Sequence, residues 1–408
     1  MPSLILSNAR LANGRITDIT IKDGRISHIG SSNFGEKIDC HNALAIPAAC
    51  DMHVHMRDGV QSAKEDWSTG TMSAAAGGAA TVVDQPNSIP ANETREIFIK
   101  RVNEAKRKSF TNFGVNGSVT DNADFVGLIE EGALAFGEMF AGASSYGSAL
   151  TPETIDKSLE ILAEKNMLVT VHAEEVLSQD VNNLRDHSKS RPVSGEIKTI
   201  ELVNSLSHGA RLHYCHISSA KSFDSIKGTF EVAPHHLLLN YEEAEPCDTH
   251  FRMNPPLRLK KEQRELLANF DKIPVIASDH APHTVDEKAL EFSKAPSGVP
   301  GVETMLPLLM NLVYEKKISL ESVISKTVTN PCGILKIEAP SISVGARADI
   351  AVYSDVPEKI KAENLHSKAG WTPYENMNGV FPKMTVVNGC VVYRDGEFSR
   401  GENIWFRN

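Results

Sequence analysis

The sequence lacks the patterns of a membrane or secreted protein. No apolar stretch approaches the roughly 18 residues that a membrane-spanning helix needs, and the first thirty residues hold no basic segment followed by an apolar core, so we expect no secretory signal. The cysteines are scattered and form no CxxC pair (Cys40, Cys50, Cys215, Cys247, Cys332 and Cys390). In a chain of 408 residues this pattern predicts reduced thiols and a cytoplasmic protein.

An excess of basic residues is also missing. The chain has 42 Lys and Arg against 52 Asp and Glu, a formal net charge of -10. Nucleic acids and anionic membranes bind basic surfaces, so we expect neither as a partner. An anionic small substrate would instead need a local group of Arg, Lys, His or metal ions.

The two ends of the chain resemble each other. Both carry Asn-Gly and Asp-Gly pairs between short alternating apolar runs, at residues 13–14, 23–24, 388–389 and 395–396. Such pairs suit two-residue hairpin turns because they tolerate positive φ. Neither end is long enough to bury a core alone. The pattern therefore predicts one small β-sandwich built jointly from residues 1–48 and 341–408.

Residues 49–340 alternate between apolar runs and helical patterns. Eight short apolar runs can be counted: ALAIPAACDMHVH, ATVVDQP, FGVNGSV, ALAFGEMF, MLVTVHAE, RLHYCHIS, FEVAPHHLLL and PVIASDH. Eight βα units in a segment of about 290 residues favour an α/β fold of the closed (β/α)8 TIM-barrel type. The alternative is an open doubly wound sheet, but the segment has no glycine-rich phosphate loop to support it.

Ligand-type side chains end four of these runs. His53 and His55 end the first, His172 the fifth, His216 the sixth and Asp279 the eighth. Residues i and i+2 of a strand share a face, and barrel strands converge at their carboxyl ends. A single histidine would more often be an ordinary buried polar residue, but the joint placement predicts a site for Zn²⁺ or a similar ion, with room for water.

Longer motifs add a family resemblance that covers most of the chain. DMHVHMRDG, TVVDQPN, HAEE, CHISS, MNPPLR, SDHAPH, GVPGVET and GARADI resemble the amidohydrolase superfamily, and within it the dihydroorotases. The resemblance implies a metal-dependent enzyme of pyrimidine biosynthesis that reversibly cyclises N-carbamoyl-L-aspartate to L-dihydroorotate. It further implies attack by a metal-activated hydroxide, with Asp279 as the general acid and base.

The same resemblance implies the substrate-binding groups. Arg57, Asn87 and His283 match positions that hold the substrate carboxylate, and a guanidinium can take a carboxylate through two hydrogen bonds. Asn254 and the backbone at Ser297 and Gly298 match positions that contact the ring amide.

Two alternatives stay open at this point. Allantoinases and dihydropyrimidinases bind uncharged rings and differ at the position of Arg57. A non-catalytic barrel that serves as a scaffold would have lost metal ligands, which this chain retains. Among the other polar residues, one of the pair His235 and His236 is expected to orient a metal ligand without binding the metal, and His187 and Arg191 are expected to have a structural role.

The chain departs from the family pattern at the fourth run. Many relatives bridge two metals there with a carbamylated lysine, whereas this chain has Glu138. A carboxylate also offers two oxygens on an extended arm, so we predict two Zn²⁺ ions per chain bridged by Glu138. The alternative is a single metal with Glu138 behind the ligands. The resemblance also implies a homo-oligomer and leaves open a contact with aspartate transcarbamoylase.

Overall fold

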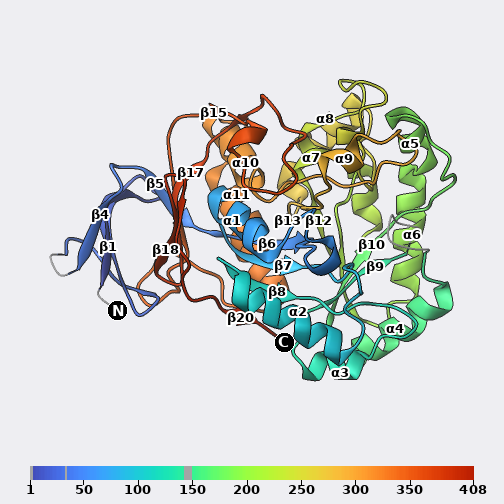
Figure 1. The fold of residues 1–408 in the computed structure, drawn as a ribbon, viewed down its shortest axis with the longest axis horizontal. Coiled ribbons are helices and arrows are strands. Elements are labelled where there is room, and N and C mark those ends of the chain that lie inside the picture. The colour runs from blue at the N-terminus through green and yellow to red at the C-terminus, as the bar shows by residue number, and fades with distance from the viewer. Residues whose placement is uncertain (1–2, 33–34, 142–148) are drawn as a thin grey trace.

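The computed structural model describes residues 3–32, 35–141 and 149–408. Figure 1 shows an α/β body and, on its left, a β structure that combines blue strands from the start of the chain with red strands from its end. None of the helices in the described ranges is long and apolar enough to cross a membrane.

Eight parallel strands form the body of the fold. They are β6 (Ala49–Val54), β7 (Ala79–Asp84), β8 (Asn112–Val115), β9 (Phe136–Phe140), β10 (Leu168–His172), β11 (Arg211–Tyr214), β12 (Thr229–Val232) and β13 (Val275–Ile276). Each of the eight apolar runs overlaps one of them. Strands such as β10, whose five residues are all buried, are covered on both faces, as continuous apolar runs require.

The eight strands close into a ring. Strands β6 to β8 pair in order, and so do strands β9 to β13. A parallel bridge between Gly117 and Phe136 joins β8 to β9, and a second one between Val54 and His280 joins the end of β13 to β6. The closed (β/α)8 barrel predicted from the sequence is therefore confirmed.

Helices lie between and after the barrel strands. They are α1 (Trp67–Gly77), α2 (Arg95–Lys108), α3 (Phe125–Glu130), α4 (Pro152–Glu164), α5 (Leu184–Ser190), α6 (Val193–Ser205), α7 (Pro234–Leu238), α8 (Lys260–Ala268), α9 (Val285–Lys288), α10 (Met305–Tyr314), α11 (Leu320–Ile324) and α12 (Asn330–Leu335). Short 3₁₀ or π turns lie at 59–61, 220–225, 249–251, 270–272, 325–329 and 362–364.

Helix α4 shows how the sequence sets such an element. It begins at Thr151, whose hydroxyl accepts from the Thr154 amide, and has a proline in its first turn. Its apolar residues Ile155, Leu159 and Leu162 recur at helical spacing and are buried in the core that the barrel strands share.

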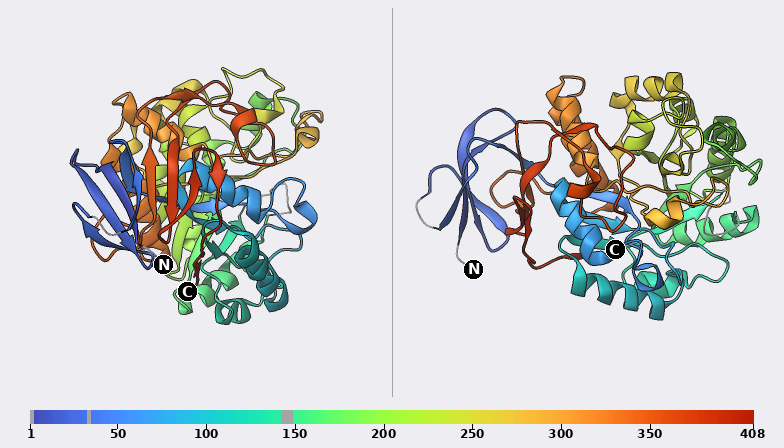
Figure 2. Two further views of the ribbon diagram at one scale, coloured as in Figure 1. Left: turned by 60° about the vertical axis from the view of Figure 1, so that its left-hand side comes forward. Right: turned by 45° about the horizontal axis from the view of Figure 1, so that its top comes forward.

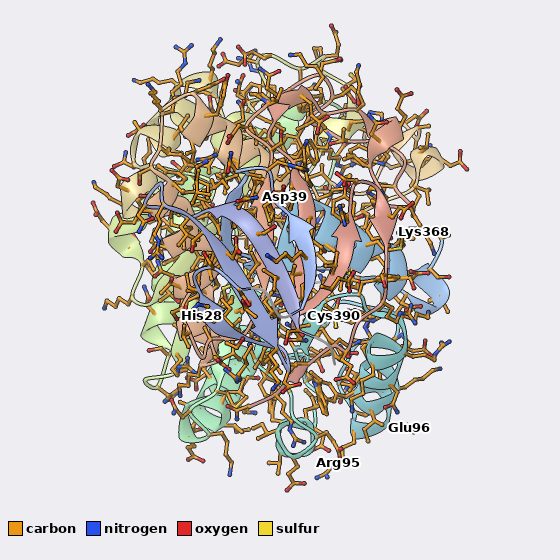
Figure 3. All side chains as sticks on the ribbon, turned by 90° about the vertical axis from the view of Figure 1, so that its left-hand side faces the viewer. His28, Asp39, Arg95, Glu96, Lys368 and Cys390 are labelled. Carbon is orange, nitrogen blue, oxygen red and sulfur yellow. The ribbon has the colours of Figure 1, made fainter. Side chains whose placement is uncertain are left out.

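The terminal strands form one nine-stranded sheet. Its order is β19-β18-β17-β14-β5-β1-β2-β3, with β4 beside β1. The strands are β1 (Leu4–Arg10), β2 (Ile16–Lys22), β3 (Arg25–Ile29), β4 (Glu36–Asp39), β5 (Leu44–Pro47), β14 (Ile350–Tyr353), β17 (Pro382–Val387), β18 (Cys390–Arg394) and β19 (Glu397–Phe398). Figure 2 shows blue strands from the start of the chain and red strands from its C-terminal part in this layer, and Figure 3 faces it, with Asp39 and Cys390 labelled.

Strands from both ends share a core and make the composite β-sandwich. Leu6 and Ile19 from the start of the chain are buried in one cluster with Ile350 and Val386 from its end. Three of the predicted Asn-Gly and Asp-Gly pairs are two-residue hairpin turns with positive φ at both residues, at 23–24, 388–389 and 395–396.

Two segments of the C-terminal part leave this sheet. Strand β20 (Trp405–Phe406) returns to the barrel and pairs in parallel with β8. Between β14 and β17, the short strands β15 (Glu358–Lys359) and β16 (Asn378–Gly379) pair with each other. The loop that joins them reaches the barrel loop after β13, where the Trp371 indole donates to the His283 carbonyl at 2.8 Å.

Candidate metal centre and active site

The strand ends bring the predicted ligands to one place. His53 lies on β6 and His55 directly after it, while Glu138 and His172 lie on β9 and β10. His216 and Asp279 follow β11 and β13 within three residues. All six side chains are buried, so their charges and ring nitrogens act on one another in a medium of low polarity.

One half of the centre is formed by two imidazoles and a carboxylate. The Nε2 atoms of His53 and His55 each lie 3.4 Å from Asp279 Oδ1. Ligand atoms about 3.4 Å apart suit one cation, because zinc binds such nitrogen and oxygen atoms at about 2.0–2.2 Å.

The other half is formed around Glu138. Its Oε1 lies 2.8 Å from His172 Nδ1 and 2.7 Å from His216 Nε2, and these two nitrogens are 3.1 Å apart. Its Oε2 faces the first half, 3.9 Å from His53 Nε2 and 4.0 Å from His55 Nε2. The two oxygens of Glu138 therefore point to the two halves of the centre.

Several observations fit a metal at this centre. His53 Nε2 is fully buried and has no hydrogen-bond partner within the described ranges, although two carboxylates lie close to it. Burial raises the pKa of Asp279, but its hydrogen bond to His55 and the nearby imidazoles outweigh this and hold the pKa below the usual range. Ionised carboxylates beside ring nitrogens that are free to donate a lone pair are the donor set of a divalent ion.

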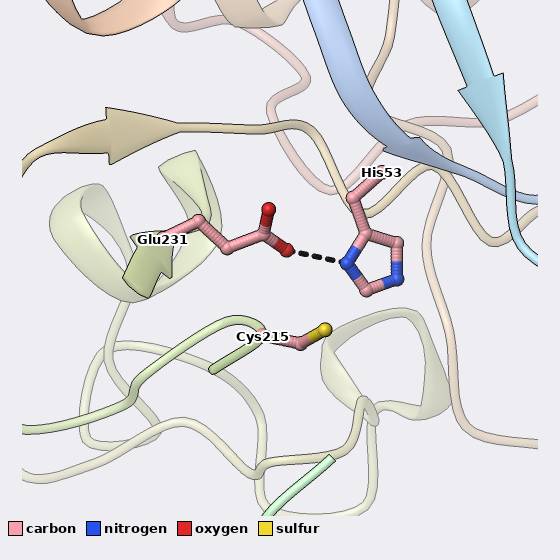
Figure 4. Close-up of side chains that lie close together, drawn as sticks. All are labelled: His53, Cys215 and Glu231. Carbon is pink, nitrogen blue, oxygen red and sulfur yellow. Dashed lines mark hydrogen bonds and ion pairs between the residues drawn. The ribbon is translucent and has the colours of Figure 1, made fainter. Parts of the chain in front are cut away.

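Buried carboxylates orient the ligand imidazoles from behind. His53 Nδ1 donates to Glu231 on β12, with the Cys215 side chain beside the pair (Figure 4). His172 Nε2 donates to Glu174 at 2.7 Å, and Glu174 also accepts from Arg191. A metal-binding histidine normally donates its second ring proton in this way, which fixes the nitrogen that faces the metal.

These two carboxylates were not among the site residues predicted from the sequence. Glu231 is the only acid within the seventh apolar run, and Glu174 stands two residues after His172 in HAEE. An acidic residue inside a buried run was the signal that could have found Glu231. His235, expected as a supporting residue, places Nε2 4.0 Å from Asp279 Oδ2. Cys215 is buried, and burial raises the pKa of its thiol, so it stays protonated.

Three site residues have left-handed backbone conformations. The φ values are 51° at Arg57, 34° at His216 and 47° at Asp279. Residues other than glycine seldom adopt such angles, and they concentrate at functional sites where the surrounding structure enforces them. Each of the three residues follows a barrel strand by two or three positions and lines the cleft.

Five of the six predicted substrate groups line the same cleft as the candidate metal ligands. Arg57, Asn87, Asn254, Ser297 and Gly298 line it together with His55, Glu138, His172, His216 and Asp279. His283 does not line the cleft itself. Its Nε2 donates to the carbonyl of Ser297, which does, at 3.1 Å. A larger cavity of about 510 Å³ lies by the loop around His366, away from these ligands, so the chemistry of the lining and not the size identifies the site.

Contacts to the backbone hold the substrate groups in place. Asp84 and Arg101 form a buried ion pair at 2.8 Å, and they bind the Met56 amide and the Arg57 carbonyl. On the other wall, His187 donates to the Met253 carbonyl at 3.0 Å and His236 to the Pro255 carbonyl at 3.0 Å. His187 thus has the structural role predicted for it, on the segment that carries Asn254.

Comparison with known proteins gives consistent results. The sequence profile of the amidohydrolase family matches residues 44–397. The chain is 36% identical to a dihydroorotase of Methanosarcina acetivorans, over 98% of this chain and 95% of that protein. It is also 36% identical to a dihydroorotase of Halobacterium salinarum, over 96% and 97%.

Solved structures share the fold. An L-hydantoinase (dihydropyrimidinase) from Arthrobacter aurescens superposes with a TM-score of 0.93 at 23% identity, over 100% of both chains. A D-hydantoinase (dihydropyrimidinase) from Thermus sp. gives 0.88 at 22% identity, over 99% of both. At this level of identity the likeness establishes the fold alone, and the chemistry has to be argued from the site.

Proposed function

Because this chain belongs to the amidohydrolase family, and within it to the dihydroorotases, we propose that it reversibly closes N-carbamoyl-L-aspartate to L-dihydroorotate. It is a metal-dependent cyclic amidohydrolase. The dihydroorotases that support this assignment align with the chain over nearly the whole length of both proteins. The observation that carries the choice of substrate is the presence of Arg57 in the same cleft as the candidate metal ligands.

Arg57 accounts for the choice among cyclic amides. A guanidinium can bind the exocyclic carboxylate of dihydroorotate through two hydrogen bonds, and Asn87 lines the same cleft. A ring without that carboxylate forgoes this contact. Sites that bind a charged group of the substrate discriminate strongly against analogues that lack it.

We propose two Zn²⁺ ions per chain. His53, His55 and Asp279 would hold one, and His172 and His216 the other, with Glu138 between them. The direction of the two Glu138 oxygens supports this arrangement. When bound, such ions make water available as a nucleophile at neutral pH and polarise the amide carbonyl.

Side chains and backbone groups of the protein carry out the proton transfer and orient the substrate. Asp279, ionised in the resting site, accepts the proton of the attacking water during ring opening and returns it to the leaving ring nitrogen. One carboxylate suffices because the two proton transfers are successive. Asn254 and the backbone at Ser297 and Gly298 orient the ring amide, and fixing the ring beside the nucleophile makes the attack effectively intramolecular.

The cellular setting is part of the proposal. The six cysteines are all free thiols, which supports a reducing compartment such as the cytoplasm. A homo-oligomer and a contact with aspartate transcarbamoylase stay predictions from the family resemblance.

Substrate choice and metal content test the proposal together. Ring opening of L-dihydroorotate, dihydrouracil and allantoin would be followed on protein whose bound metal has been counted. We expect turnover of L-dihydroorotate alone, with two metals per chain. Comparable turnover of the uncharged rings would refute the role of Arg57, and protein without metal or activity would point to the non-catalytic scaffold.

A further inference from the structure

Lys288 is a buried cation on the substrate side of the cleft whose role the chemistry above does not explain. It ends helix α9, which starts at a capping box of Thr284 and Glu287, and only 1% of its surface is exposed. Burial lowers its pKa from 10.5 to about 7, so keeping the ammonium here costs free energy. Such a cost calls for a compensating structural or functional role.

The ammonium of Lys288 binds three backbone carbonyls. It donates to Arg252 at 3.1 Å, to Pro296 at 3.0 Å and to Gly298 at 3.0 Å. Three acceptors take up all three protons of an ammonium group. The nearby acids Asp248 and Glu287 act on it only through longer-range Coulomb attraction. Lys288 therefore acts as a tether between backbone segments.

The tethered segments are the ones that carry the proposed ring-binding groups. Arg252 lies two residues before Asn254, and Pro296 and Gly298 flank Ser297. Both segments lie outside regular helices and strands, so no ladder of backbone hydrogen bonds sets their separation. One direct backbone bond joins them beside the lysine, from the Gly298 amide to the Arg252 carbonyl at 3.0 Å, and the Arg252 guanidinium also donates to the Ala295 carbonyl at 2.6 Å.

Two further contacts restrict the positions that the segments of Asn254 and of Ser297–Gly298 can take. Gly298 has a φ of 134°, and a Cβ there would lie 2.6 Å from the Ala281 carbonyl oxygen, so the segment passes very close to the loop after β13. The Lys288 nitrogen also lies 5.2 Å from the centre of the Trp371 ring, and Trp371 donates to the His283 carbonyl. The lysine thus binds the segments of Asn254 and Ser297 and approaches the Trp371 ring, while it does not itself line the cleft.

We propose that Lys288 is a positioning residue for substrate recognition, which holds the segments of Asn254 and of Ser297–Gly298 at the separation that the ring amide requires. The inference rests on the proposed function. A shift of about 1 Å in a positioning group can cost two orders of magnitude in catalytic efficiency. Loss of the tether should therefore appear in substrate affinity, with the metal centre unaffected.

A second buried lysine provides a matched control. Lys326 is 6% exposed and donates to the carbonyls of Asp271 at 3.2 Å and Ile273 at 2.5 Å. Its nitrogen lies 5.2 Å from the Phe270 ring, the same distance as between Lys288 and Trp371. These carbonyls precede β13, whereas Asp279 follows it, so Lys326 does the same structural work at the opposite end of the barrel.

The experiment compares Lys288→Met with Lys326→Met in the metal-loaded enzyme. Melting temperature, metal content, and kcat and KM for ring opening of L-dihydroorotate would be measured for both variants. We expect both to melt earlier and keep their metal. Lys288→Met should raise KM roughly tenfold or more with kcat within about threefold, whereas Lys326→Met should leave KM unchanged.

Clear outcomes would overturn the inference. An unchanged KM in Lys288→Met, or an equal rise in Lys326→Met, would show that Lys288 serves stability alone. If Lys288→Met does not fold, Lys288→Gln replaces it, because its amide keeps two donors on a shorter side chain. This variant should give a smaller rise in KM, and an unchanged KM would also refute the positioning role of Lys288. A wild-type enzyme that is inactive on L-dihydroorotate would instead refute the proposed function itself.

Discussion

The two walls of the cleft are built by different means. On the metal side, His53, Glu138 and His172 lie on barrel strands, so the barrel itself sets their spacing. On the substrate side, Asn254 and Ser297 lie on irregular segments. Those segments are held by side chains that bind backbone carbonyls, such as His187 and Lys288.

Because the metal ligands lie on strands and the substrate groups on loop segments, the same fold can retain its metal chemistry while the bound substrate differs. Ligands on strands move only if the barrel moves, and the rings are fixed further by carboxylates such as Glu231. Loop segments can change without disturbing the barrel, because each depends on its own tethers. Substitutions on the metal side should therefore affect metal and rate, and those on the substrate side should affect KM.

The largest effect is expected from Asp279→Asn on the metal side. The amide cannot accept the water proton, so kcat should fall by about 10³-fold or more, as expected for loss of a general base. Steady-state kinetics on protein of known metal content would measure it. Asp271→Asn, an exposed change before β13, serves as the control. A residual kcat above a tenth of the wild-type value would exclude Asp279 as the proton carrier.

Arg57→Met tests the substrate side. Truncating one partner of a charged hydrogen-bonded pair costs about 2–5 kcal/mol, so KM for L-dihydroorotate should rise roughly 10²-fold. Metal content should stay at the wild-type level, because Arg57 is not among the candidate ligands. The exposed Arg95→Met is the matched control. Equal KM values for Arg57→Met and wild type would remove Arg57 from the substrate site.

Glu231→Gln separates metal binding from substrate binding. The neutral amide holds the His53 ring less firmly and lowers its basicity, so metal affinity should fall about 10–100-fold. Competition with a chelator would give the dissociation constant, and KM at saturating metal should change little. If the metal affinity of the variant equals that of the wild type, the buried carboxylate does not support the centre.

The smallest expected effect is a pH dependence of stability that comes from His187. Burial lowers its pKa from 6.5 to about 3. Between these values the unfolded chain binds a proton that the folded chain does not, so stability is lost as the pH falls below 6.5, by up to about 1.4 kcal/mol per unit. Urea unfolding at pH 7 and pH 5 should show this loss in the wild type.

His187→Gln provides the comparison. Its amide can still donate to the Met253 carbonyl but does not titrate. The stability difference between pH 7 and pH 5 should therefore be smaller in the variant than in the wild type. Identical differences in the two proteins would mean that His187 does not contribute to the acid sensitivity.

The barrel and its ligands could be predicted because local patterns determine them. Each apolar run overlaps a barrel strand, and the carboxyl ends of all eight strands meet at the mouth of the barrel, where the ligand-type residues stand. The tethers could not be predicted in this way. Lys288 ends a short polar helix in the sequence, and its burial depends on segments brought together from elsewhere in the chain.

Two other features depended on tertiary structure. Strand β20 is only two residues long, and its place beside β8 is set by long-range pairing that no local pattern signals. Glu231 lies in a run that was interpreted correctly as a strand. Which face of that strand looks into the barrel follows only from the register with its neighbours.

We propose that Glu138 takes the place of the carbamylated lysine of many relatives and joins two metal sites. This proposal is tested most directly by counting zinc in the wild type and in Glu138→Ala after reconstitution in bicarbonate-free buffer. We predict two ions per chain in the wild type without bicarbonate, and one or fewer in Glu138→Ala. Two ions per chain in Glu138→Ala would contradict the account.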